Sequence, residues 1–237
     1  MVAPTLGTST RDPAVAKMFD DLSPRYDLVN HLITFGQATR WRRRLVSLLP
    51  GGGRVLDLGC GTGDVMIEVL RQGRATNVVG VDLTPGMLRR AGERLADGGV
   101  GERARLLRGD GETLPFRDAC FEAVVSSFVM RNVGDRAAAY REIARVLKPG
   151  GRYVQLEMGR PRNRLARKGF LFYFQRLMPL FAGLVAGDRT PYKYLAEGLD
   201  RWPHQDDVSK EIKTEGFASV EMVEVAMGTA AIHAATK

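Results

Sequence analysis

The chain has 237 residues, of which 44% are hydrophobic, and this favours one large α/β domain with a full core. Its two cysteines, Cys60 and Cys120, are too few for a disulfide framework, and no metal-ligand spacing is present, so we expect no metal site and a reducing cytosol. The formal charge of +8 predicts attraction to an anionic partner, with simple solubility as the alternative. The longest apolar run, residues 169–187, is interrupted by polar residues and a proline and makes a poor transmembrane span.

The chain begins with elements that are expected to be helical. Residues 1–11 are small and polar and are expected to be a frayed tail. The spacing of Val15, Phe19 and Leu22 then predicts a helix, and a second helical pattern passes through Trp41. We therefore expect a helical cap over residues 12–50.

From residue 54 the pattern alternates between apolar strand runs and helical runs, which is typical of a parallel sheet covered on both faces. The expected strands are 54–58, 77–81, 105–108, 121–126 and 152–157, and the expected helices lie near 64–71, 85–96 and 136–147. Residues 216–225 and 229–234 look like two further strands with no helix between them. They should therefore form a hairpin and add an antiparallel edge.

These elements predict a single domain over residues 12–237. Its parts are the cap, a cofactor-binding core at 54–158, a lid insertion at 159–205, and a C-terminal helix and hairpin at 206–237. The fold class is α/β, with a Rossmann-like seven-stranded sheet and an antiparallel C-terminal edge strand. This layout resembles that of class I methyltransferases.

Residues 55–64, with the sequence Val-Leu-Asp-Leu-Gly-Cys-Gly-Thr-Gly-Asp, read as a buried strand, a glycine turn and a helix N-terminus. A dinucleotide-binding loop needs its third glycine where this chain has Asp64, and a carboxylate there would repel a pyrophosphate. S-adenosylmethionine has no phosphate. Its cationic sulfonium and ammonium groups fit beside Asp57 and Asp64, so the loop with Gly59, Gly61 and Gly63 favours this cofactor.

Acidic residues follow the next two strands. Asp82 can accept hydrogen bonds from both ribose hydroxyls, as acids at this position also do in NAD sites. Asp110 can accept from an adenine amino group, while the backbone of Gly111 lets the ring approach. Their position at successive strand ends strengthens the prediction of an S-adenosylmethionine site.

Several sequence words resemble the menaquinone/ubiquinone ring C-methyltransferases over nearly the whole chain from Val15 onward. The more specific words are Arg-Tyr-Asp at residues 25–27 and Arg-Asn-Val at residues 131–133, and Ala-Ile-His at 231–233 also fits. The resemblance implies that the cofactor is held by a set of residues at the strand ends. These are Thr62, Asp82, Asp110, Gly111 and Ser127.

The resemblance also implies methylation of a ring carbon in a prenylated quinol, such as the conversion of demethylmenaquinol to menaquinol or a step on a ubiquinone precursor. Arg131 and Asn132 are expected to orient the phenol oxygens. Tyr26 and Asp27 are expected to close the pocket, with Asp27 or a bound water as the base. For Arg131 the alternative is a structural ion pair.

Two words depart from the family pattern. Val129 and Met130 stand where the family usually has Gly-Leu, and Met158 and Gly159 stand where it has Phe-Ser. Both words fall at the edge of the sheet where the acceptor is expected, so a soluble phenolic or natural-product acceptor stays open as the alternative.

The insertion suggests a membrane contact. Basic residues at 160–168, followed by an aromatic stretch at 170–174, are expected to meet an anionic surface and border a channel for the quinol tail, unless the insertion only packs as a lid. We expect a cytoplasmic protein with peripheral contact at the inner membrane surface. No nucleic acid partner is expected, because no base-methylation word or RNA module is visible. The sequence leaves open whether the protein forms a homodimer. It also leaves open the alternative that the protein binds the cofactor without catalysis, as a partner in a biosynthetic complex.

Overall fold

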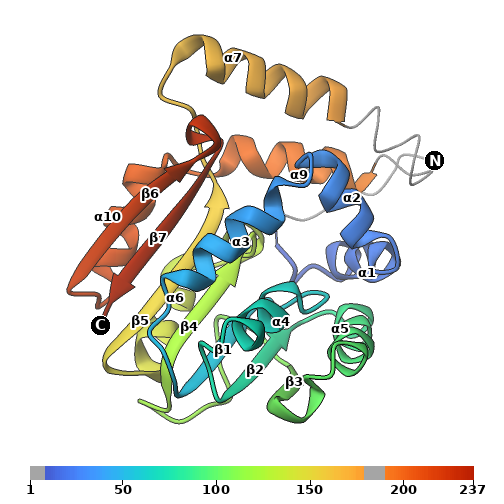
Figure 1. Cartoon of the computed structure of the whole chain (residues 1–237). Coiled ribbons are helices and arrows are strands. Elements are labelled where there is room, and N and C mark those ends of the chain that lie inside the picture. The colour runs from blue at the N-terminus through green and yellow to red at the C-terminus, as the bar shows by residue number, and fades with distance from the viewer. Residues whose placement is uncertain (1–8, 179–189) are drawn as a thin grey trace.

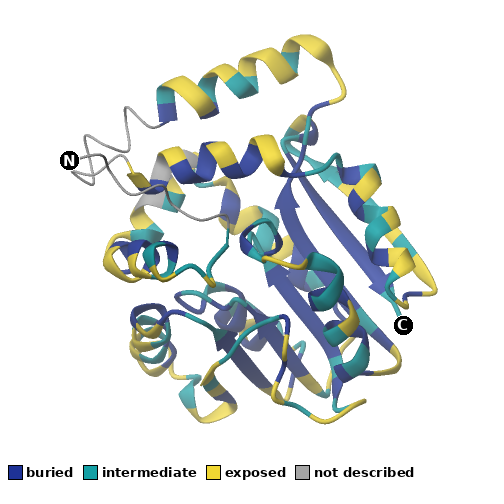
Figure 2. Cartoon of the chain, turned by 180° about the vertical axis from the view of Figure 1, so that it is seen from behind, coloured by how far each residue is buried: buried dark blue, intermediate teal, exposed yellow. Residues whose placement is uncertain are grey.

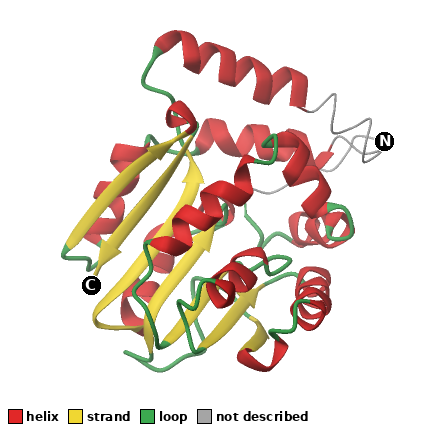
Figure 3. Ribbon diagram, viewed as in Figure 1, coloured by secondary structure: helices red, strands yellow, loops and turns green. Residues whose placement is uncertain are grey.

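The computed structural model describes residues 9–178 and 190–237, and its centre is a seven-stranded sheet (Figures 1 and 3). The strands are β1 (Arg54–Leu58), β2 (Asn77–Asp82), β3 (Ala104–Arg108), β4 (Phe121–Ser127), β5 (Leu147–Met158), β6 (Ser219–Val225) and β7 (Ala230–Thr236). Their order is β3-β2-β1-β4-β5-β7-β6, with β1 to β5 parallel and β7 antiparallel to both of its neighbours. The predicted sheet with its antiparallel C-terminal edge is confirmed.

The fifth strand begins earlier than expected. Leu147 already pairs with Phe121, and the ladder then resumes between Arg152 and Ala123 after a shift in register. The Pro-Gly-Gly turn at 149–151 therefore lies within the strand as an irregularity instead of preceding it.

Helices cover both faces of the sheet (Figure 2). Val55 on β1 packs with the helices α3 (Gln37–Ser47) and α4 (Asp64–Arg71), while its neighbour Leu56 packs with α6 (Arg136–Val146) and α10 (Gln205–Thr214). Successive side chains of a strand point to opposite faces. Burial on both faces explains why the strands read as continuous apolar runs in the sequence.

Two N-terminal helices, α1 (Pro13–Leu22) and α2 (Tyr26–Ile33), gather with α9 (Thr190–Arg201) at the end where the parallel strands finish (Figure 1). Asp12 caps α1 by accepting from the N–H of Ala14 at 2.8 Å. Asp20 accepts from the N–H of Gly86, next to the start of α5 (Pro85–Asp97), at 2.5 Å. These bonds hold the first helix over the ends of the strands.

The insertion contains α7 (Arg164–Phe172), a π-helical turn η3 (Tyr173–Leu177) and α9. None of the residues of α7 is buried, and the helix lies outermost in the molecule (Figures 1 and 2). Part of the apolar run at 169–187 lies outside the described residues. No helix among residues 9–178 and 190–237 is both long enough and apolar enough to cross a membrane.

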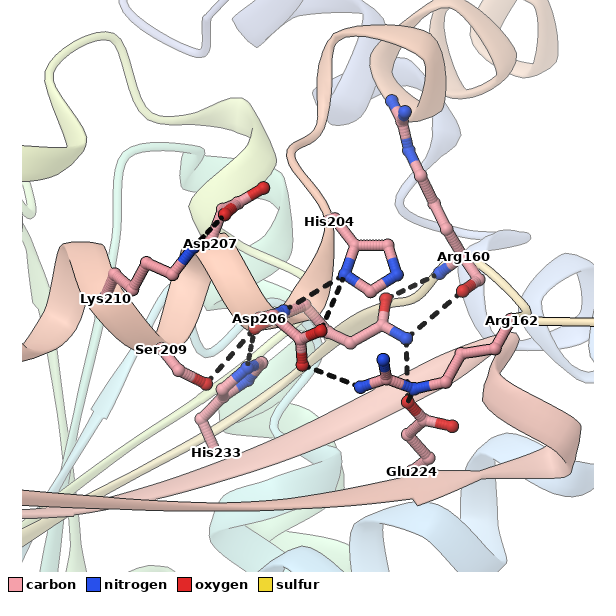
Figure 4. Close-up of polar contacts among 10 residues, drawn as sticks. Arg160, Arg162, His204, Asp206, Asp207, Ser209, Lys210, Glu224 and His233 are labelled. Atoms are coloured by element: carbon pink, nitrogen blue, oxygen red, sulfur yellow. Dashed lines mark hydrogen bonds and ion pairs between the residues drawn. The ribbon is translucent and has the colours of Figure 1, made fainter.

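The start of the insertion is fastened to the C-terminal hairpin (Figure 4). Arg162 forms ion pairs with Asp206 and Glu224, each at 2.7 Å. Arg160 donates to three backbone carbonyls near the C-terminal end of α9, including that of Trp202 at 2.7 Å. These two arginines were expected on a membrane-facing basic segment. They are committed to the fold instead, because α10 and the hairpin bring acids and helix-end carbonyls to them.

Candidate active site

The loop after β1 requires glycine for two reasons. Gly59 and Gly63 have φ values of 64° and 84°, in the left-handed region that favours glycine. In addition, a Cβ atom on Gly59 would lie 2.5 Å from the Val129 side chain. The N–H of Gly61 donates to the Asp82 carboxylate at 2.9 Å, which joins the loop to the end of β2.

A cavity of about 740 Å³, partly open to solvent, lies against this loop; we call it the loop cavity. It gathers most of the residues that the sequence predicts for cofactor binding, together with two predicted for catalysis. Its lining includes Gly59, Gly61, Asp82, Asp110, Gly111, Ser127, Tyr26 and Asn132. A small recess beside it is lined by Asp57 and Thr62. Gly63 lines neither and shapes the turn.

Unpartnered polar atoms face the recess. Asp57 is 1% exposed, and its Oδ2 has no hydrogen-bond partner within the described part of the chain. The buried Oγ of Ser127 is also unpartnered among those residues. Burial raises the pKa of Asp57 well above its usual range, and the nearby Asp82 charge adds to this. The ammonium group of S-adenosylmethionine would supply the cationic hydrogen-bond donor that the buried Asp57 carboxylate lacks.

Asp64 was expected to lie beside the positive charges of the cofactor, but in the structure its carboxylate pairs with two arginines. Arg42 of α3 and Arg94 of α5 both form ion pairs with it, the latter at 2.6 Å. Burial opposes ionisation of Asp64, but the two guanidinium groups outweigh it and lower the pKa. Asp64 therefore joins three helices, and its charge is already balanced.

Asp27 is held in a structural tie. The hydroxyl of Thr62 donates to one of its oxygens at 2.6 Å, and Arg94 pairs with the other at 3.2 Å. Asp27 lines a polar cavity with His31. It does not line the loop cavity, so this geometry favours fastening of α2 to the loop over proton abstraction.

The described end of the segment that was expected to be a frayed tail, residues 9–11, lies at the loop cavity. Arg11 pairs with Asp110 at 2.6 Å and with Glu112 at 2.8 Å, and the N–H of Thr10 donates to the carbonyl of Asn132 at 2.9 Å. Thr10 and Arg11 both line the cavity. The tail prediction was wrong at these residues, because partners distant in the sequence order them.

A second, larger cavity of about 1110 Å³ adjoins the first; we call it the apolar cavity. Tyr26 and Phe128 line both cavities. Arg131 lines the apolar cavity, with its Nη1 3.0 Å from the Glu157 carboxylate and its Cζ 5.3 Å from the centre of the Phe128 ring. Of the predicted catalytic residues, Tyr26 and Arg131 thus reach this cavity, whereas Asn132 reaches only the loop cavity.

Several residues of the apolar cavity were not foreseen. Five described non-glycine residues have a positive φ, and four of them line this cavity: Phe35, Phe128, Ala226 and Met227. Strained backbone of this kind clusters at functional sites. In contrast, Phe170 of α7 and Tyr173 and Phe174 of the π-helical turn, which also line this cavity, fall within the stretch 170–174 that the sequence marks as aromatic.

The sheet order, the glycine loop at the end of β1 and the acids after β1, β2 and β3 define a class I S-adenosylmethionine-dependent methyltransferase. A methyltransferase of this kind from Thermotoga maritima has the same fold, with a TM-score of 0.68 and 18% identity over 93% of this chain and 99% of that chain. The [4+2]-cyclase SpnF is also similar, with a TM-score of 0.65 and 18% identity over 98% of this chain and 97% of that chain. At this identity these likenesses concern the fold alone.

The chain belongs to the ubiE/COQ5 methyltransferase family, whose model matches residues 7–237. A demethylmenaquinone methyltransferase from Roseiflexus sp. is 38% identical over 94% of this chain and 93% of its own length. The ubiquinone/menaquinone biosynthesis C-methyltransferase UbiE of Geobacter sulfurreducens is 38% identical over 94% of this chain and 88% of its own length. The predicted family, enzyme class and cofactor are therefore confirmed: the protein is an S-adenosylmethionine-dependent methyltransferase.

Proposed function

We propose that the enzyme methylates a ring carbon of a prenylated quinol, converting demethylmenaquinol to menaquinol or acting on the matching ubiquinone precursor. The observation that carries this proposal is the junction of the two cavities at Tyr26 and Phe128. An acceptor in the apolar cavity would meet the methyl donor there. The names of the relatives favour the same acceptor class.

The chemistry needs an ionised phenol, because ionisation makes the neighbouring ring carbon nucleophilic. S-adenosylmethionine, when bound, supplies an electrophilic methyl group. Arg131 lines the apolar cavity, and its hydrogen bond to Glu157 uses one of the five guanidinium N–H groups. The remaining donors suit a phenolate oxygen, whose charge they would stabilise.

Aromatic walls would orient the ring and exclude water. The Trp41 and Phe128 rings lie edge to face at 6.4 Å, and Phe35 lies against Tyr173 at 5.4 Å. All four residues line the apolar cavity. Fixing a planar acceptor between such walls supplies much of the rate in a two-substrate reaction.

The departures from the family pattern bear little on the acceptor. Met130 is fully buried, Val129 packs against Gly59, and a Cβ on Gly159 would lie 2.5 Å from the Gly228 carbonyl oxygen. Met158 alone of the four lines the apolar cavity in the described part of the chain. Three of the four departures therefore give no argument for a soluble phenol over a quinol.

A methyl-transfer assay tests the proposal by offering the purified enzyme demethylmenaquinol, a ubiquinone precursor and a soluble phenol side by side. We expect methylation of a prenylated quinol, with a lower KM than for the soluble phenol because the tail buries apolar surface. Methylation of the soluble phenol alone would overturn the quinol assignment while leaving the enzyme class intact.

We also propose that α7 contacts an anionic membrane surface. Its exposed face combines the basic residues Arg164, Arg167 and Lys168 with Leu165 and Phe172, which are 79% and 60% exposed. We call these five residues the α7 patch. Basic and apolar side chains on one unburied helix suit an interfacial position. The tail of a prenylated quinol resides in the bilayer, so contact there would shorten the path to the apolar cavity.

Liposome flotation tests this contact with a variant that replaces Arg164, Arg167 and Lys168 by Glu. We expect the wild type to float with vesicles that contain anionic lipid and the variant to remain in the dense fraction. The matched control reverses three exposed arginines near β3, Arg71, Arg103 and Arg105, and should float like the wild type. Equal loss in both variants would indicate a response to net charge and would remove α7 from the proposal.

A further inference from the structure

Glu157 is a buried acid that pairs with Arg131 of the apolar cavity, and the methyl-transfer chemistry described above gives it no role. It stands near the C-terminal end of β5 and is 1% exposed. One carboxylate oxygen accepts from Arg131 at 3.0 Å and from the N–H of Met158 at 3.2 Å. The other oxygen is buried and has no hydrogen-bond partner among the described residues.

A carboxylate with an unpartnered oxygen is costly to bury, so hydrophobic packing alone does not account for this group. Burial raises the pKa of Glu157, and the Arg131 guanidinium counters this in part. Besides burial, the charge of Glu157 in turn helps to raise the pKa of the Tyr140 hydroxyl on α6 and of the Tyr153 hydroxyl on β5. Tyr194 on α9 faces Arg131. None of these tyrosines is a cation, which leaves Arg131 as the basic group that Glu157 meets within the described structure.

Arg131 joins Glu157 to the acceptor. Its side chain runs past Phe128 and lines the apolar cavity, while the Nη1 end is held by the carboxylate. A long side chain on a short 3-10 turn, η2 (Met130–Asn132), has many rotamers. A single charge-assisted bond to a buried acid selects one of them.

We propose that Glu157 is a positioning residue, whose buried carboxylate fixes the Arg131 guanidinium at the apolar cavity and limits the positive charge that an acceptor oxygen meets there. This inference rests on the proposed function, because it assigns Arg131 to an ionising phenol. Position and charge are separable by substitution. Glu157→Asp keeps the charge and withdraws the carboxylate by one methylene, whereas Glu157→Gln keeps the size and removes the charge.

The experiment measures kcat and KM for the acceptor across pH in the full-length enzyme, together with the dissociation constant for S-adenosylmethionine and the Tm. For Glu157→Asp we expect kcat to fall about tenfold or more, because the Arg131 guanidinium is displaced from the acceptor. The acid limb of the pH profile should not move, because the charge at this position is kept. For Glu157→Gln we expect the acid limb to move down by about one pH unit, because an uncompensated Arg131 lowers the pKa of the bound phenol. Cofactor affinity should stay within about twofold in both variants.

Glu211→Gln is the matched control, because Glu211 forms an ion pair with Arg136 at 2.9 Å and lines neither cavity. It should lower the Tm without moving kcat or the acid limb. If Glu157 only stabilises the fold, its variants will behave like this control, and that result overturns the inference. Should Glu157→Gln fail to fold, an unchanged kcat in Glu157→Asp overturns it equally.

The wild type separates this inference from the proposed function. If it methylates only the soluble phenol, the quinol assignment fails, and the same variants are then measured with that phenol. A shifted acid limb in Glu157→Gln and a reduced kcat in Glu157→Asp would still support the role of Glu157. Unchanged profiles would overturn it with either acceptor.

Discussion

The loop cavity is lined mainly by the segments that follow β1, β2 and β3, whereas the apolar cavity is lined by α2, α3, the η2 turn, the π-helical turn and the tip of the β6–β7 hairpin. The first is bounded by glycines, acids and backbone groups at the end of a rigid sheet. The second is bounded mostly by side chains from segments outside the parallel strands, with Met158 at the end of β5 as an exception. On the proposed function, binding of the methyl donor thus depends mainly on the sheet, and the choice of acceptor depends mainly on elements attached to the sheet.

Substitutions in the two cavities should therefore have different effects on turnover and on cofactor affinity. A change in the wall of the apolar cavity should alter turnover while cofactor affinity is kept, and a change in the recess should do the reverse. Tyr26 and Phe128 line both the loop cavity and the apolar cavity, and Arg42 lines both the apolar cavity and the recess, so substitutions at these residues should combine the two effects.

The largest effect is expected from Arg131→Ala. Loss of the guanidinium removes the group that we propose to stabilise the ionised phenol, and kcat should fall about 100- to 1000-fold, as when one oxyanion donor is removed. S-adenosylmethionine affinity, measured by calorimetry, should stay within about twofold. Arg136→Ala, which breaks the ion pair with Glu211 away from both cavities, serves as the control. Unchanged turnover in Arg131→Ala would remove this residue from the chemistry.

Asp57→Asn is the matching change on the cofactor side. We expect S-adenosylmethionine to bind about 100-fold more weakly, because a charge-assisted bond to its ammonium is lost. The Tm of the ligand-free enzyme should rise at the same time, since an unpartnered buried carboxylate disappears. The exposed Asp97→Asn should change neither quantity. An unchanged affinity in Asp57→Asn would show that the recess does not hold the ammonium.

The pH dependence of cofactor binding sharpens this assignment. Burial raises the pKa of Asp57, so its carboxyl takes up a proton at a pH where an exposed aspartate remains ionised. Only the ionised form suits the ammonium, so affinity should be constant above the raised pKa and fall about tenfold for each pH unit below it. Calorimetric titrations at several pH values test this. The Asp57→Asn enzyme should show a flat profile, and a sloping one would assign the titration to another group.

The same division separates what the sequence predicts from what it does not. The strands were predictable because residues buried on both faces, such as Val55 and Leu56, form uninterrupted apolar runs. The glycine loop and Asp82 were predictable because they are adjacent to strand ends. The early start of β5 at Leu147 was not, because the helical pattern runs to residue 147 and the Pro-Gly-Gly turn was expected to separate that helix from the strand.

Apart from the aromatic stretch at 170–174, the residues that line the apolar cavity have no local sequence pattern that predicts their role. Phe35, Phe128 and Met227 adopt positive φ values that their residue types rarely show, so nothing in their neighbourhood announces them. The tie between Asp27 and Thr62 joins residues 35 positions apart. Without these distant partners, the sequence alone could not distinguish a structural role of Asp27 from that of a catalytic base.

The smallest effect is expected from Arg11→Gln, which tests whether the N-terminal segment belongs to the cofactor side. Arg11 is about half exposed, so its pairs with Asp110 and Glu112 are partly screened, and a two- to threefold change is expected for about 0.5 kcal/mol. Because Arg11 lines the loop cavity, the change should be a faster release of S-adenosylmethionine, measured by stopped-flow fluorescence, with acceptor KM unaltered. Arg90→Gln, which breaks an exposed pair with Glu93 on α5, should leave release unchanged. A slower release in Arg11→Gln would mean that the pair holds Asp110 away from the cofactor and that the segment opposes binding.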